Sequence, residues 1–131
     1  MNTKVILSAA ATVLGMSGLA LTFMPSETGE FLFTELVASP LILQVLGALY
    51  FAFAMLNWML KDSLIGGIYN RPAAVANLSH FMIVGIALVK ELLLAPETGT
   101  VFNVITAVYV VFALLFAIVL FRHPTPEKKR I

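Results

Sequence analysis

The sequence predicts an all-α fold: an integral membrane bundle of four helices joined by short loops. Of its 131 residues, 60% are hydrophobic and only 11% are charged, which is unlike the composition of a soluble domain. The apolar residues form four runs, each close to the roughly 20 residues that a helix needs to cross a hydrocarbon core. Backbone groups in lipid must be paired within their own segment, so each run should be helical. We expect one transmembrane domain over residues 1–131, with helices at about 5–24, 41–60, 72–94 and 101–121.

Charged residues separate the two sets of helix ends. The basic residues flank one set and are Lys4, Lys61, Arg71, Arg122, Lys128, Lys129 and Arg130. The connections at the opposite ends carry no basic residue and hold Glu27, Glu30, Glu35 and Glu97. By the positive-inside rule, both termini and the middle loop should be cytoplasmic.

The first predicted helix carries a stripe of small residues at spacings of three and four: Ser8, Ala11, Gly15, Gly18 and Thr22. Small side chains let a neighbouring helix approach closely in a membrane. We interpret the stripe as a packing surface, for either another helix of this chain or a second protomer. A signal peptide is the competing interpretation of this run, and we favour a retained helix because the run exceeds a usual signal core.

A Pro, Glu-Thr-Gly pattern follows the first and the third predicted helix. The copies read LTFMPSETGEF from Leu21 and LLLAPETGTVF from Leu92. Proline ends a helix and glycine permits a turn, so we interpret both copies as punctuation, with or without an ancient duplication. A ligand-binding role is the alternative. The first connection is the longer one and predicts a short interfacial helix over Glu27–Val37.

The second predicted helix begins after a plausible N-cap, Ser39, with a proline at its first position. It offers another small surface, made by Gly47, Ala48, Ala52 and Ala54. Trp58 falls near its inner boundary, where amphipathic aromatic rings are common.

The third predicted helix holds the best candidates for a binding site. Asn77, His80 and Glu91 share one face by their helical spacing. His80 lies roughly 12 Å in from the cytoplasmic start of the helix, so it needs a polar partner. Asn57 of the second helix and Asn77 are at compatible depths. A pocket for a head group, small solute or proton is one hypothesis, and the favoured one is a hydrogen-bond cluster between helices.

The fourth predicted helix, over 101–121, carries Tyr109 near mid-depth. Elsewhere the absence of cysteine removes thiolate chemistry, and no zinc spacing, phosphate-binding glycine loop or paired-carboxylate site occurs. We therefore expect no catalytic residue, no metal and no cofactor. The basic tail RHPTPEKKRI indicates a topology anchor that contacts anionic lipid, and nucleic-acid binding is not expected.

Three stretches, GLALTFMP, LGALYFAFAMLNW and YNRPAAVANLSHF, together resemble the small four-helix bacterial inner-membrane proteins of the DoxX-like families. The resemblance implies a four-helix fold and a bacterial inner membrane. It also implies a link to quinone-linked redox complexes, with which some such proteins are associated. No catalytic motif of these families is matched in this sequence, so the resemblance assigns no functional residue.

Three functional hypotheses follow. The first is a non-enzymatic accessory or structural subunit of a membrane assembly, whose partners are the lipid bilayer and either copies of itself or another membrane protein. The second is a carrier or binding protein for a small solute or lipid that uses Asn57, Asn77, His80 and Glu91. The third is a subunit of a quinone-linked redox complex.

Overall fold

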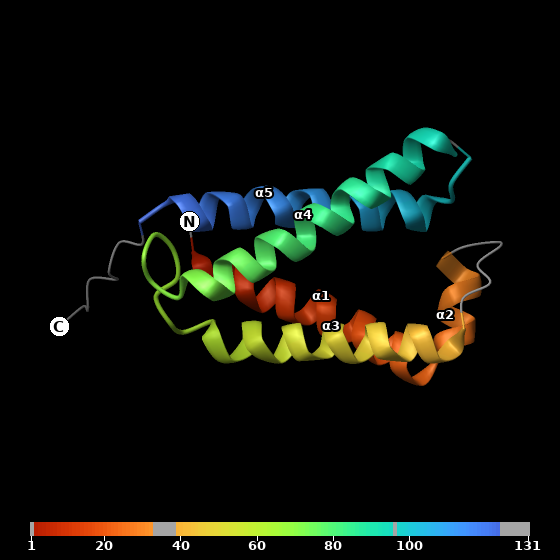
Figure 1. Ribbon diagram of the computed structural model, residues 1–131, viewed down its shortest axis with the longest axis horizontal. Coiled ribbons are helices and arrows are strands. Elements are labelled where there is room, and N and C mark those ends of the chain that lie inside the picture. Colours follow the sequence, from red (N-terminus) through yellow and green to blue (C-terminus); the bar gives the residue numbers. More distant parts are fainter. Residues whose placement is uncertain (1, 33–38, 96, 124–131) are drawn as a thin grey trace. The chain divides into compact units, whose positions relative to one another are not determined.

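The computed structural model describes residues 2–32, 39–95 and 97–123. These residues form five helices and no strand, which confirms the all-α class for them (Figure 1). The helices are α1 (Thr3–Phe23), α2 (Pro25–Leu32), α3 (Pro40–Leu60), α4 (Arg71–Leu94) and α5 (Thr100–Phe121). All but α2 are long and apolar enough to cross a membrane. Together they indicate a multi-pass membrane protein.

The four long helices begin one or two residues before the apolar runs do. Polar and proline residues build their first turns. Asn2 caps α1 by accepting a hydrogen bond from the backbone N–H of Lys4, at 3.1 Å. Pro40 opens α3, where its missing N–H leaves no helical bond unmade.

The chain divides into two compact units. One spans residues 2–61 and contains α1, α2 and α3, and the other begins at Asp62 and contains α4 and α5. In each unit the two long helices run antiparallel, as Figure 1 shows. The sequence leads us to expect a single domain over residues 1–131, and that expectation stays a prediction.

In the first unit, α1 and α3 approach each other through glycines. A Cβ atom on Gly18 would lie 2.8 Å from the carbonyl oxygen of Gly47 and 2.8 Å from the backbone nitrogen of Phe51. A Cβ atom on Gly15 would make an ordinary contact with Ala54, at 3.5 Å. Gly15 and Gly18 of the small stripe therefore face α3 of the same chain.

The two Pro, Glu-Thr-Gly copies end a helix in the same way and then diverge. After α1, Met24 donates its N–H to the carbonyl of Ala20, and Pro25 opens the eight-residue helix α2, which contacts both α1 and α3. After α4, Ala95 donates to Glu91, and Gly99 stands before the first residue of α5. The short helix predicted over Glu27–Val37 thus begins two residues earlier, and residues 33–38 lie outside the described part of the chain.

In the second unit, the loop before α4 is tied to the end of α5. Gly66 and Gly67 have φ angles of 127° and 58°, which favour glycine. The N–H of Gly67 donates to the carbonyl of Leu120, at 3.2 Å. A Cβ atom on Gly67 would lie 2.5 Å from Nδ1 of His123, so the imidazole occupies the space that a side chain would need.

Candidate functional site

His80 lies half-buried on α4 and faces Tyr109 of α5. The Tyr109 hydroxyl is 3.5 Å from Nε2 of His80, and the two ring centres are 5.7 Å apart. The distance of 3.5 Å between the hydroxyl oxygen and Nε2 is at the long limit of a hydrogen bond, so this polar contact is weak. The sequence placed Tyr109 near mid-depth but did not pair it with His80.

An aromatic cluster, made by Phe81, Tyr109, Phe112 and Phe116, joins α4 to α5. Phe81 is fully buried. Its ring stacks on Phe112 and Phe116, with ring centres 4.8 and 5.6 Å away, and tilts against Tyr109 at 5.3 Å. Offset and tilted pairs at these distances are favourable arrangements for aromatic rings. His80 meets the edge of this cluster, in a T-shaped contact with Phe81 at 5.1 Å.

The two amides predicted to serve His80 are both fully buried. The side chain of Asn77 donates to the carbonyl of Ala73, one turn back on its own helix, at 2.9 Å. Asn57 lies on α3, in the other unit, so its pairing with His80 stays a prediction. Among the described residues, every buried side-chain nitrogen and oxygen has a hydrogen-bond partner.

Glu91 lies near the opposite end of α4 from Asn77. Its side chain is exposed. It lies eleven positions after His80, which is roughly 16 Å along a helix axis. The packed face of α4 instead carries Ala74, Asn77, Phe81 and Gly85. The face predicted from the helical spacing therefore carries the buried amide of Asn77 near the start of α4 and the exposed carboxylate of Glu91 near its end.

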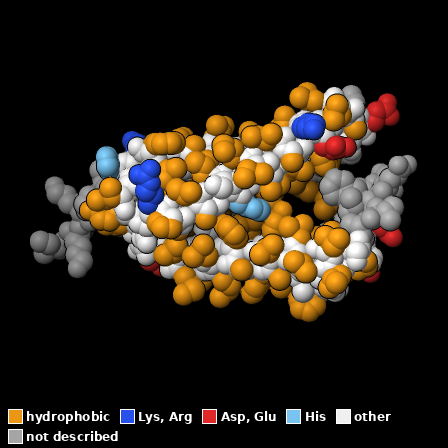
Figure 2. Space-filling model, in the orientation of Figure 1, with side chains coloured by type: hydrophobic (Ala, Val, Ile, Leu, Met, Phe, Trp, Pro, Cys, Tyr) orange, Lys and Arg blue, Asp and Glu red, His pale blue; other side chains and the backbone are white. Residues whose placement is uncertain are grey.

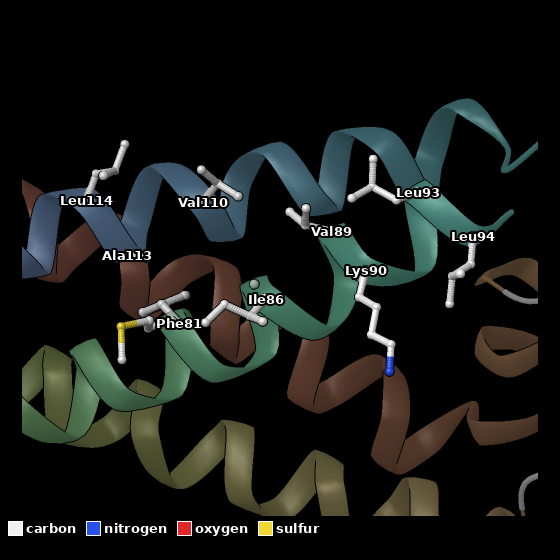
Figure 3. Close-up of a pocket in the computed structure, with 11 residues that line it drawn as sticks. Phe81, Ile86, Val89, Lys90, Leu93, Leu94, Val110, Ala113 and Leu114 are labelled. Carbon is white, nitrogen blue, oxygen red and sulfur yellow. The ribbon is translucent and has the colours of Figure 1, made fainter. Parts of the chain in front are cut away.

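An apolar groove between α4 and α5 is a feature that the sequence analysis missed. It has a volume of about 530 Å³, and Lys90 is the one charged residue in its lining (Figure 3). Neither His80 nor Glu91 lines it. Two small residues, Gly85 and Ala113, stand among large lining residues on the two helices. The small side chains at Gly85 and Ala113 were the feature of the sequence that could have indicated the groove.

Within residues 2–32, 39–95 and 97–123, no group of three or more His, Cys, Asp or Glu side chains could hold a metal ion. The candidates for a reactive pair are the half-buried imidazole of His80 and the hydroxyl of Tyr109, which lie within 3.5 Å of each other. A nucleophile would need a base within hydrogen-bond reach and a third group that orients this base. The contacts of His80 with Tyr109 and Phe81 do not supply that arrangement.

No family model, no curated protein and no solved structure matches the chain. The resemblance to the DoxX-like proteins therefore stays a prediction.

Proposed function

We propose that this protein is a non-enzymatic accessory or structural subunit of a membrane assembly in the bacterial inner membrane. One observation carries the proposal: in the described part of the chain, the buried polar side-chain atoms all have hydrogen-bond partners. A polar group in hydrocarbon is a functional candidate when it is unexplained. The Asn77 amide bonds to the carbonyl of Ala73 on its own helix, so its burial is explained without a ligand.

The surface of the long helices supports the same role. Large apolar side chains are exposed along them, and Figure 2 shows hydrophobic side chains over most of the face in view. On α3 they include Leu41, Ile42, Val45 and Leu49. Lipid covers such a surface, and so does another membrane protein, which makes these helices available for assembly.

For the topology, we propose one bundle of four crossings with both termini and the middle loop on the cytoplasmic side. The Lys61 ammonium lies 3.0 Å from the centre of the Trp58 ring at the inner end of α3. A cation over an aromatic ring suits the membrane interface, where both groups keep their polar parts near water. The acidic turn between α4 and α5 then lies on the outer side.

The two alternatives have less support. A carrier requires a cavity that reaches both His80 and Glu91, and the α4–α5 groove includes neither. The role in a quinone-linked redox complex rests on the DoxX-like resemblance alone. Both alternatives remain hypotheses, and the experiment below separates them from the structural role.

The test is the mass of the native particle, extracted in mild detergent, with its proteins and small molecules identified by mass spectrometry. We expect a distinct membrane-protein partner at fixed stoichiometry, and the same stoichiometry in a His80→Leu variant. The reason is that the Tyr109 hydroxyl lies at the long limit of a hydrogen bond from His80 and His80 contacts the edge of the aromatic cluster through Phe81. The structural role is contradicted by a partner-free homo-oligomer that retains a small molecule and loses it in His80→Leu. A redox protein as the partner would support the third hypothesis.

A further inference from the structure

The α4–α5 groove has the chemistry of a hydrocarbon site. Eight of its lining residues come from α4 and three from α5, and all but Lys90 are apolar or glycine. Figure 3 shows Phe81 and Leu114 toward one end of the groove, and Leu93 and Leu94 toward the other. A volume of about 530 Å³ falls in the range of small-ligand sites, about 300 to 1,000 Å³.

The length and depth of the groove match one leaflet of a bilayer. Phe81 lies ten residues into α4, which is about 15 Å from its start and close to mid-depth of a hydrocarbon core of about 30 Å. From Phe81 to Leu94 the groove follows thirteen residues, or about 20 Å. It therefore runs from the middle of the membrane to the boundary beside the α4–α5 turn.

The rim of the groove is open. Ile86, Leu93 and Leu114 are 63%, 76% and 62% exposed. Their apolar side chains need an apolar cover in the membrane, and a groove of this volume suits one flexible chain. A second copy of the protein would instead need a broad face, about 800 Å² per partner in a typical stable interface.

Lys90 lies one helical turn before Leu94, near the boundary end of the groove. The stem of its side chain contributes to the lining, and the ammonium nitrogen extends away from the apolar residues (Figure 3). A lysine near a membrane boundary buries its stem and directs its charge to the head-group region. An ammonium ion there complements the negative charge of a lipid phosphate.

We propose that this groove binds one acyl chain of a phospholipid from the leaflet beside the α4–α5 turn, with the Lys90 ammonium on the lipid phosphate. The site is separate from His80 and does not depend on the proposed structural role. A bound lipid of this kind fills the space left by Gly85 and Ala113 and completes the packing of α4 against α5.

Photo-crosslinking tests the proposal. The protein is reconstituted in vesicles of phosphatidylglycerol and phosphatidylethanolamine that contain a phosphatidylglycerol with a diazirine midway along one acyl chain. We expect label to concentrate on Ile86, Val89 and Val110. Ala113→Phe should lower this labelling about tenfold, the equivalent of about 1.4 kcal/mol, because the new ring occupies the groove. Lys90→Gln should lower it about fivefold, as expected for one lysine beside an anionic lipid surface.

Two matched controls separate the site from general lipid contact. Ala107→Phe adds the same ring to an exposed position of α5 outside the groove, and Arg71→Gln removes a charge at the other end of α4. Both should leave the groove labelling unchanged. Equal labelling of the exposed α3 residues Val45 and Leu49 would overturn the proposal, and so would groove crosslinks to a second copy of the chain. If Ala113→Phe does not fold, the comparison of Lys90→Gln with Arg71→Gln decides.

Discussion

Gly47→Ala is expected to destabilise the protein by about 2 kcal/mol, within the range of overpacking substitutions. The added Cβ would lie 2.5 Å from Oγ1 of Thr22, 2.8 Å from the carbonyl oxygen of Gly18 and 2.9 Å from the backbone nitrogen of Thr22. Two of these atoms belong to the backbone of α1, so relief requires α1 to move away from α3. The loss of stability can be measured as a shift in the unfolding midpoint in detergent, followed by circular dichroism.

Gly85→Ala is the matched control, since Gly85 is also a buried glycine within a long helix. A Cβ there would lie 3.8 Å from the nearest atoms of Tyr109, which is ordinary contact. Alanine favours a helix over glycine by up to about 1 kcal/mol, so this variant should be neutral or more stable. Equal destabilisation by the two variants would contradict the close approach of α1 and α3 at Gly47.

Phe81→Ala is expected to cost about 3 kcal/mol, the lower end of the range for large aromatic truncations in cores. The lower end applies because lipid, rather than water, surrounds the unpacked helices and no transfer from water is lost. The substitution removes the ring that contacts Tyr109, Phe112 and Phe116. The same detergent unfolding experiment measures the cost.

The control for this variant is Phe121→Ala at the end of α5, where the ring is 79% exposed. A surface substitution of this kind should change the free energy of unfolding by no more than about 0.5 kcal/mol. Similar costs at Phe81 and Phe121 would mean that the aromatic cluster does not hold α4 to α5.

The four long helices were predictable because each membrane crossing requires a continuous run of apolar residues in the sequence. The different local structures of the two Pro, Glu-Thr-Gly copies were not predictable from the residues that the copies have in common. In the second copy the apolar residues of α5 follow the glycine at once, so α5 must start at Thr100 to cross the membrane. The first copy continues with Glu30, Phe31 and Leu32, which leaves residues for the separate helix α2.

The candidate site was predicted only in part. The sequence indicated that His80 and the buried Asn77 lie inside the protein, because a polar side chain in an apolar run is conspicuous. It did not indicate Tyr109 as the contact of His80, because phenylalanine and tyrosine in a transmembrane run resemble lipid-facing residues. The spacings of three and four between Tyr109, Phe112 and Phe116 were the available signal that these rings share a face of α5.

The assignment of the protein to the membrane rests on four crossings, and single-cysteine labelling tests it most directly. The chain has no cysteine, so Ser26→Cys, Ser63→Cys and Glu97→Cys each introduce one thiol at an exposed position. In intact spheroplasts, a membrane-impermeant maleimide should label Ser26→Cys and Glu97→Cys, and should label Ser63→Cys only after permeabilisation. Labelling of Ser63→Cys together with the other two in intact spheroplasts would contradict the four-crossing topology.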